Sequence, residues 1–212
     1  MPLLIALAVL LALLADPAHA ARLVTDPHFY KVTAQHRIKL EFPVGELKVV
    51  GTDADQVEFR VTAVCDDQDD AACAKRANRL ELESTDRDGV LHLKLSNYPK
   101  FNTHSMHLEG ELRVPRRLAI SVDMGVGELE ANDLSGDLDA DLGVGQATVR
   151  TALATTGRVN AVAGIGEASI QGASDGKQTS SFIGANSSWN GGPGKAAIKV
   201  HVGVGEAAVK LK

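Results

Sequence analysis

Three histidines are the residues whose type and spacing best suit chemistry. If the strands expected on either side of the loop near Tyr98-Pro99-Lys100 form a hairpin, His92 and His107 lie opposite each other on its outer face, with His104 close by. Imidazole nitrogens bind both zinc and copper. No cysteine or carboxylate completes the set, so the candidate metal site of His92, His104 and His107 competes with ordinary surface histidines. The sequence indicates no organic cofactor.

Two acidic segments and one aromatic residue are the other candidates. The cluster from Asp66 to Asp70 could bind calcium if its loop curled, but it lacks the Gly and the bidentate Glu of a helix-loop-helix calcium loop. Asp137, Asp139 and Asp141 alternate along one expected strand, where solvated charges are the better interpretation. Trp189, the one tryptophan, either stacks on a sugar ring or fills core space beside Ser187 and Ser188.

The motifs of common catalysts and nucleotide-binding proteins are absent. The repeated Gly-x-Gly is followed neither by the third glycine of a dinucleotide fingerprint nor by a Gly-Lys-Ser/Thr loop, and there is no Gly-x-Ser-x-Gly. The formal net charge is −5 and no basic stripe is present, which excludes a nucleic-acid partner. We therefore expect a non-enzyme.

The amino-terminal residues predict export. Leu3 to Ala15 form an apolar run that is too short to cross a bilayer, and Ala18-His19-Ala20 is typical of a signal-peptidase site. We expect residues 1–20 to be a signal peptide, with a buried core helix as the alternative, and no transmembrane segment in the mature chain. In an exported protein Cys65 and Cys73, the only cysteines, predict a loop-closing disulfide; a redox or metal pair is the alternative.

One phrase recurs about every 20 residues and defines the expected fold. Alternating apolar residues lead into a glycine, an aliphatic residue and a second glycine, after which the apolar positions shift parity. The copies are Gly125-Val126-Gly127-Glu128-Leu129, Gly143-Val144-Gly145-Gln146-Ala147, Gly164-Ile165-Gly166-Glu167-Ala168 and Gly203-Val204-Gly205-Glu206-Ala207, with a degenerate copy at 181–189. Period-two alternation predicts strands, and glycine permits a bend. We expect an all-β β-solenoid of sequential coils, with Val126, Val144, Ile165 and Val204 in one interior column.

The section before the repeat is also expected to be β-structure. Residues 36–51 resemble an earlier coil, since Gly45-Glu46-Leu47 repeats Gly127-Glu128-Leu129, although Pro43 replaces the first glycine. Residues 52–117 carry further alternating stretches that predict hairpins capping the stack, and the linker from Asp66 to Asn78 predicts a helical turn or two. The expected domain thus has an N-terminal β section (21–117) and a Gly-x-Gly repeat section (118–212).

These phrases, together with Leu134-Ser135-Gly136-Asp137-Leu138, resemble the bacterial putative-adhesin domain family of unknown function. The resemblance is firmest over 118–212 and looser over 30–117. It implies an exported β-helix-like protein with no established catalytic residues. We therefore expect a non-catalytic cell-envelope protein of the periplasm or cell surface, whose partner is an envelope protein or a glycan. The alternatives are a periplasmic metal-binding protein using the histidines and a small glycan-active β-helix enzyme.

Overall fold

The computed structural model describes residues 21–66, 71–99, 106–173, 177–179 and 183–212, and these form an all-β protein with a short α-helix and a 3-10 turn. The helix is α1 (Ala71–Ala77), and the turn is η1 (Leu153–Thr155). The strands are β1 (Ala21–Val24), β2 (His28–Lys31), β3 (Arg37–Thr52), β4 (Gln56–Cys65), β5 (Glu81–Arg87), β6 (Val90–Ser96), β7 (Met106–Pro115), β8 (Ala119–Leu134), β9 (Leu138–Thr151), β10 (Thr156–Gln171), β11 (Lys177–Thr179), β12 (Ile183–Asn190) and β13 (Ala196–Leu211).

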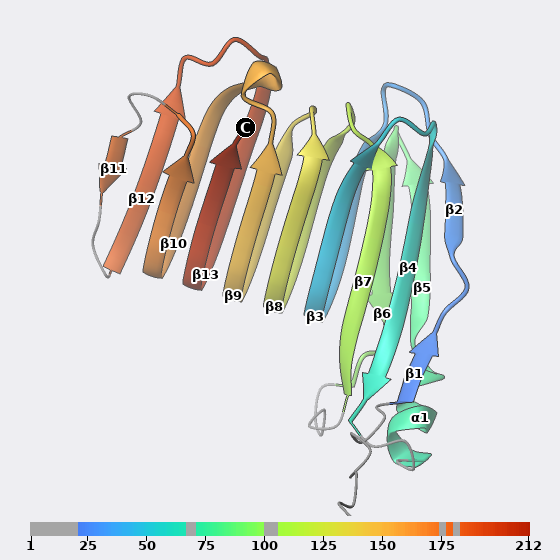
Figure 1. Ribbon diagram of the computed structural model, residues 1–212. Coiled ribbons are helices and arrows are strands. Elements are labelled where there is room, and N and C mark those ends of the chain that lie inside the picture. The colour runs from blue at the N-terminus through green and yellow to red at the C-terminus, as the bar shows by residue number, and fades with distance from the viewer. Residues whose placement is uncertain (1–20, 67–70, 100–105, 174–176, 180–182) are drawn as a thin grey trace, which may run out of the picture.

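Five long strands, β3, β8, β9, β13 and β10, are bent in the middle and carry the core. Each turns at the second glycine of the repeated phrase, where φ lies between +119° and +137°. The first halves form one layer and the second halves the other, as the ribbons at the lower edge of Figure 1 show. Met124 and Leu129, on either side of the bend in β8, are both buried. The apolar face of each half is therefore covered by the other half of the same strands.

The bends stack on one another through backbone contacts. A β-carbon added to Gly127 would lie 1.9 Å from the carbonyl oxygen of Gly45, and one added to Gly166 would lie 1.8 Å from that of Gly205. Because a side chain at these positions would meet rigid backbone and would also need a positive φ, only glycine lets adjacent bends pack this closely. The strands pair in parallel with the aliphatic positions aligned in the order Val44, Val126, Val144, Val204, Ile165.

The expected interior column is therefore a column, but it is not interior. Val126, Val144, Ile165 and Val204 are 43–48% exposed, whereas Leu142, two residues before Val144, is 2% exposed. The alternation of strand residues between two faces holds only while a strand is straight. At the bend the aliphatic residue lies at the apex, outside the space enclosed by the two layers.

The predicted β-solenoid of sequential coils is not found among the described residues. The sheet order is β1-β4-β7-β3-β8-β9-β13-β10-β12-β11, so β13 lies between β9 and β10 and pairs in parallel with both. The degenerate copy forms β12, which is antiparallel to β10 on the far side. The described strands form one large mixed sheet that is folded on itself and is not closed.

The N-terminal section continues the same sheet. β6 pairs with the first half of β3, and β7 pairs with its second half, so the two strands lie in different layers. The predicted hairpin of these strands is therefore wrong, because each pairs with a different half of β3 and the two lie in opposite layers. The helix expected in the linker is confirmed as α1, and the predicted disulfide joins Cys65 at the end of β4 to Cys73 in α1. No helix among the described residues is long and apolar enough to span a membrane.

Candidate functional site

The bent edge of the sheet carries a line of aliphatic side chains, which we call the aliphatic ridge; all are exposed except Val44, which is half-buried. The ridge crosses five parallel strands and continues to Ile183 on β12, which is 74% exposed and pairs with Ile165. In order across the sheet its members are Val44, Val126, Val144, Val204, Ile165 and Ile183. With strands about 4.8 Å apart, the ridge is roughly 24 Å long and one side chain wide.

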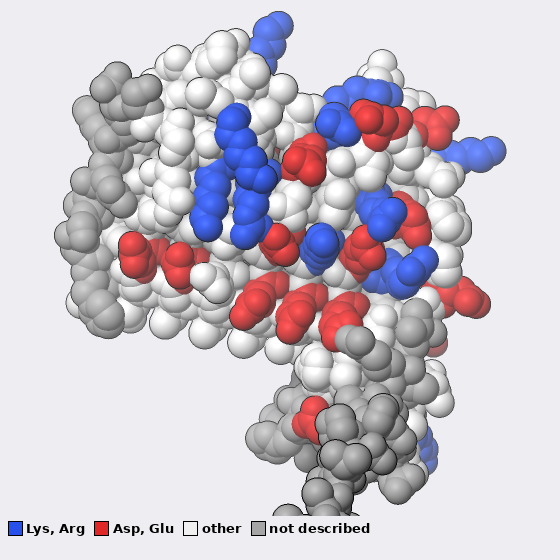
Figure 2. All heavy atoms as spheres, in the orientation of Figure 1, with Lys and Arg blue, Asp and Glu red and all other residues white. Residues whose placement is uncertain are grey.

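A line of carboxylates runs parallel to the ridge on the second-half layer, and we call it the glutamate row. Its members are the residue after the second glycine of each phrase, joined by Glu109 of β7, and they pair across the strands in the order Glu167, Glu206, Gln146, Glu128, Glu46, Glu109. Figure 2 shows this row of acidic side chains across the front, just above the uncharged lower edge. Gln146 donates a hydrogen bond to Glu206 at 2.8 Å. Glu46 and Glu128 are exposed, and the described residues provide no cation that pairs with either.

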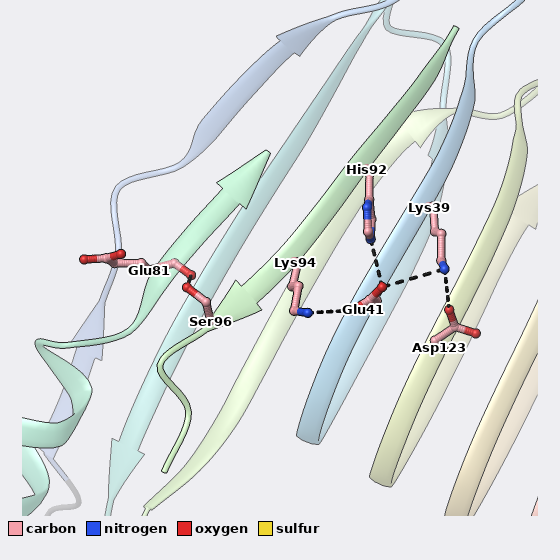
Figure 3. A network of polar contacts seen from close by, with 7 residues as sticks. All are labelled: Lys39, Glu41, Glu81, His92, Lys94, Ser96 and Asp123. Carbon is pink, nitrogen blue, oxygen red and sulfur yellow. Dashed lines mark hydrogen bonds and ion pairs between the residues drawn. The ribbon is translucent and has the colours of Figure 1, made fainter. Parts of the chain in front are cut away.

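A second polar line flanks the ridge on the first-half layer, and we call it the paired row. It runs from Lys94 through Glu41, Asp123 and Asp141 to His201. Glu41 accepts contacts from Lys94 Nζ at 3.2 Å and His92 Nε2 at 3.0 Å, and Lys39 Nζ lies 3.2 Å from Asp123, as Figure 3 shows. Asp141 lies 3.0 Å from His201 Nδ1. Each carboxylate of this row thus has a cationic or imidazole partner.

The pKa values in the paired row follow from these contacts. Partial burial acts to raise the pKa of Glu41, but the hydrogen bond and charge of Lys94, helped by His92, outweigh it and leave the pKa below its usual value. The hydrogen bond to Asp123, followed by its charge, raises the pKa of Lys39. Both groups are therefore held in their charged forms across the physiological range.

Grooves lie on both sides of the ridge. One, of about 470 Å³, lies beside the paired row, and its lining includes Asp123 and Asp141 together with Pro43, Gly125, Gly143 and Gly203. The other, of about 650 Å³, lies over the glutamate row and reaches basic residues that include Arg60, Arg150 and Lys210. Together the ridge, its two flanking rows and the grooves form one continuous surface, which we call the bend surface.

The predicted metal site is not assembled by the described residues. His92 lies on β6 against Glu41, and His107 lies on β7, 3.9 Å from Asp66. His104 is outside the described residues, as are most of the Asp66–Asp70 cluster. No group of three or more His, Cys, Asp or Glu that could hold a metal was found among the residues that the structure describes. The zinc or copper site stays a prediction, without support from the arrangement of His92 and His107.

The structure places Trp189 in the core and the aspartates Asp137, Asp139 and Asp141 at the surface. Trp189 is 9% exposed and pairs with Val159 in the core, which leaves little of its ring for a sugar. Asp139 and Asp141 are exposed on β9, whereas Asp137 accepts a hydrogen bond from the backbone of Ala197 at 2.8 Å. Asp137 therefore helps to position the start of β13.

The glutamate row is the feature that the sequence prediction missed. The signal is present in the repeated phrase itself, because the residue after the second glycine is Glu in β3, β8, β10 and β13 and Gln in β9. In-register parallel strands bring identical positions of a repeat side by side. A repeated acidic position therefore becomes a line of charge, as the aliphatic position becomes a ridge.

Comparison with known proteins supports the fold. No protein-family model matches the chain, and no curated protein matches it in sequence. The chain is similar to the crystal structure of a putative cell adhesion protein from Clostridium sporogenes, with 15% identity, a TM-score of 0.56 and coverage of 92% of this chain and 100% of that one. A putative adhesin from Bacteroides fragilis matches with 10% identity, a TM-score of 0.32 and coverage of 89% and 97%. A putative lipid-binding protein from Parabacteroides distasonis matches with 9% identity, a TM-score of 0.25 and coverage of 88% of this chain and 97% of that one.

Proposed function

We propose that this is an exported, non-catalytic, adhesin-like protein of the cell envelope that binds another envelope protein through its bend surface. The aliphatic ridge is the observation that carries the proposal. Scattered apolar residues are normal on a protein surface, but a contiguous line of them, bordered by polar rows, is typical of an interaction site. Side chains of a protein partner bury such a ridge more readily than a polysaccharide does, because a polysaccharide surface is covered with hydroxyl groups.

Further features support the export and the passive role. The Cys65–Cys73 disulfide is typical of an oxidising compartment. The carboxylates of the paired row are engaged by lysine and imidazole partners, which suits a binding scaffold better than acid-base chemistry. The similar Clostridium sporogenes protein is described as a putative cell adhesion protein, which agrees with this class, although similarity of fold alone does not transfer its partner.

Site-specific cross-linking tests the proposal. A photoactivatable amino acid placed at Val144 on the ridge should yield one protein adduct when the purified protein is irradiated with an envelope extract of its source organism. The same amino acid at Val50, a half-buried residue on the second-half layer, is the control. Equal adducts at Val144 and Val50, or none at Val144, would remove the ridge as the binding site. Sequencing of the secreted protein should find Ala21 first if residues 1–20 are a signal peptide.

A glycan is the second candidate partner, and the groove beside the paired row favours it. Asp123 and Asp141 line the groove, where their carboxylate oxygens could accept hydrogen bonds from hydroxyl groups. Calorimetric titration with soluble cell-wall fragments measures this directly. Binding that is lost in Asp141→Asn but retained in a ridge variant would favour the glycan over the protein partner.

A further inference from the structure

We propose that the partner of the aliphatic ridge is a cationic amphipathic helix, which lies across the strands with its apolar stripe on the ridge and its basic flank on the glutamate row. The inference rests on the proposed function and narrows its partner to one class of segment. The spacing of the ridge residues and the charges beside them each support the proposal, and the narrow width of the ridge argues against a second copy of the chain.

The spacing of the ridge matches a helix better than an extended peptide. Ridge residues repeat about every 4.8 Å, because they sit on neighbouring strands. The a and d positions of a helical stripe advance by about 5.2 Å on average, whereas alternate residues of an extended chain advance by about 6.7 Å. Over the four steps from Val44 to Ile165 the side chains of a helix fall out of register with the ridge by roughly 2 Å, and those of an extended chain by roughly 8 Å. Only the helix keeps its apolar side chains between those of the ridge.

The charges beside the ridge favour a helix whose flank is positively charged. On the first-half side Glu41, Asp123 and Asp141 already have partners at 3.0–3.2 Å. On the second-half side Glu46 and Glu128 face each other across adjacent strands, and neither forms an ion pair with a described residue, although Arg60 and Arg150 line the same groove. Like charges opposite each other are unfavourable in isolation. Lys or Arg on one flank of the helix would relieve this repulsion, as charges beside the seam of a coiled coil do.

The same charges and the shape of the ridge argue against other occupants. A membrane with anionic lipids would be repelled by the glutamate row. A second copy of the chain would meet the ridge along a strip only one side chain wide, far short of the roughly 800 Å² that each partner buries in a stable complex. A helix instead reaches both flanks, and its own side chains fill the grooves beside the ridge. The observations thus favour a basic helix.

Fluorescence anisotropy with synthetic peptides tests the proposal on the purified protein. The probe is an 18-residue helix with Leu at the a and d positions and Lys at the flanking positions; one control peptide replaces Lys by Glu, and another scatters the Leu residues. The basic peptide should bind at least about tenfold tighter than either control, a difference well within the reach of a few contacts. Equal binding of the acidic peptide would overturn the proposal, as would equal binding of the scattered peptide.

Substitutions in the aliphatic ridge and the glutamate row test whether the basic peptide binds there. Val144→Asp should weaken binding of the basic peptide about tenfold or more, whereas Val50→Asp, the same change on the second-half layer, should alter it by less than about twofold. Glu128→Gln should weaken it about threefold in low salt and flatten its salt dependence, while Asp55→Asn, a loop carboxylate, leaves both unchanged. Urea unfolding must show that each variant is folded. Equal losses in Val144→Asp and Val50→Asp would refute the ridge as the site.

The remaining outcomes assign the ridge to something else. If light scattering shows a dimer that Val144→Asp dissociates, the ridge binds a second copy of the chain. If the protein sediments with phosphatidylcholine vesicles and Val144→Asp abolishes this, the ridge binds lipid. Either result overturns the helix. The proposed function can survive this failure, because cross-linking at Val144 detects a protein partner of any structure; it fails only if that cross-link is also absent.

Discussion

The two polar rows that flank the aliphatic ridge are built on the same strands but differ in how their charges are compensated. In the paired row, Glu41 lies between Lys94 and His92, and Asp123 lies beside Lys39. In the glutamate row, Glu46 and Glu128 lie side by side without an ion pair to a described residue, whereas Glu109 at the end of the row lies 4.0 Å from His107 Nε2. Paired carboxylates stabilise the sheet, whereas unpaired neighbours such as Glu46 and Glu128 oppose it slightly and gain from an added cation. The difference separates a structural surface from a candidate binding surface.

The largest expected effect comes from breaking the bend that holds both rows in register. Gly127→Ala places a β-carbon 1.9 Å from the Gly45 oxygen at a φ of +133°, so we expect a loss of more than about 3 kcal/mol in the free energy of unfolding, or failure to fold. Gly184→Ala is the matched control, because its φ is +73° and its β-carbon would meet no described atom within 4 Å; we expect a loss of about 1 kcal/mol. Urea denaturation measures both. Similar losses would contradict the role given to the stacked bends.

The next effect separates the ridge from the core. Leu142→Ala should lower the free energy of unfolding by about 3 kcal/mol, since it removes a buried side chain and leaves a cavity. Val144→Ala, two residues later on the same strand, should cost less than about 1 kcal/mol, because Val144 is 46% exposed. The pair is measured by chemical denaturation under one set of conditions. A loss of unfolding free energy for Val144→Ala as large as that for Leu142→Ala would mean that the aliphatic column is buried.

A smaller effect tests the compensation of the paired row. Glu41→Gln should lower the free energy of unfolding by about 1 kcal/mol at pH 7, because Lys94 and His92 lose their anionic partner in a partly exposed site. Since the pKa of Glu41 is lowered in the folded state, its contribution is present above the unfolded pKa of about 4.3 and is lost as the pH falls through the folded value. Denaturation from pH 7 to 3 should therefore show a shallower loss in Glu41→Gln. Asp55→Asn serves as the control, with little change at pH 7.

The smallest effect has the opposite sign. Glu46→Gln removes the charge between Glu128 and Glu109 and should raise the free energy of unfolding by a few tenths of a kcal/mol in low salt. The gain should disappear near 1 M salt, where charges more than about 3 Å apart are screened. Thermal unfolding at two salt concentrations measures it. A destabilised Glu46→Gln would mean that this row is compensated like the other, and the comparison between them would no longer hold.

Local structure could be predicted from the sequence because it depends on neighbouring residues. The alternation of Ile120, Val122 and Met124 predicted a strand with these side chains inside, and all three are buried. The glycine after Val126 predicted a bend, and Gly127 has the positive φ that a bend requires. The disulfide followed from the spacing of two cysteines. Each inference used the intrinsic geometry of a short segment.

The order of the strands could not be predicted in the same way. The phrases around Val144, Ile165 and Val204 carry the same glycine register, so any of them can pack beside any other with equal backbone contacts. Sequential stacking was the simplest assumption, but β13 lies between β9 and β10. Likewise, alternation assigned Val144 to the interior because it describes straight strands only. The ridge and the glutamate row therefore emerged only once the bends were stacked.

The position of β13 bears on how the molecule is made. The strand that comes last along the chain sits in the middle of the sheet, with β9 on one side and β10 on the other. Until residues 196–211 are in place, the block ending at β9 and the block of β10 and β12 have no shared strand partner. Assembly of the continuous sheet must therefore wait for β13, however early the two blocks form.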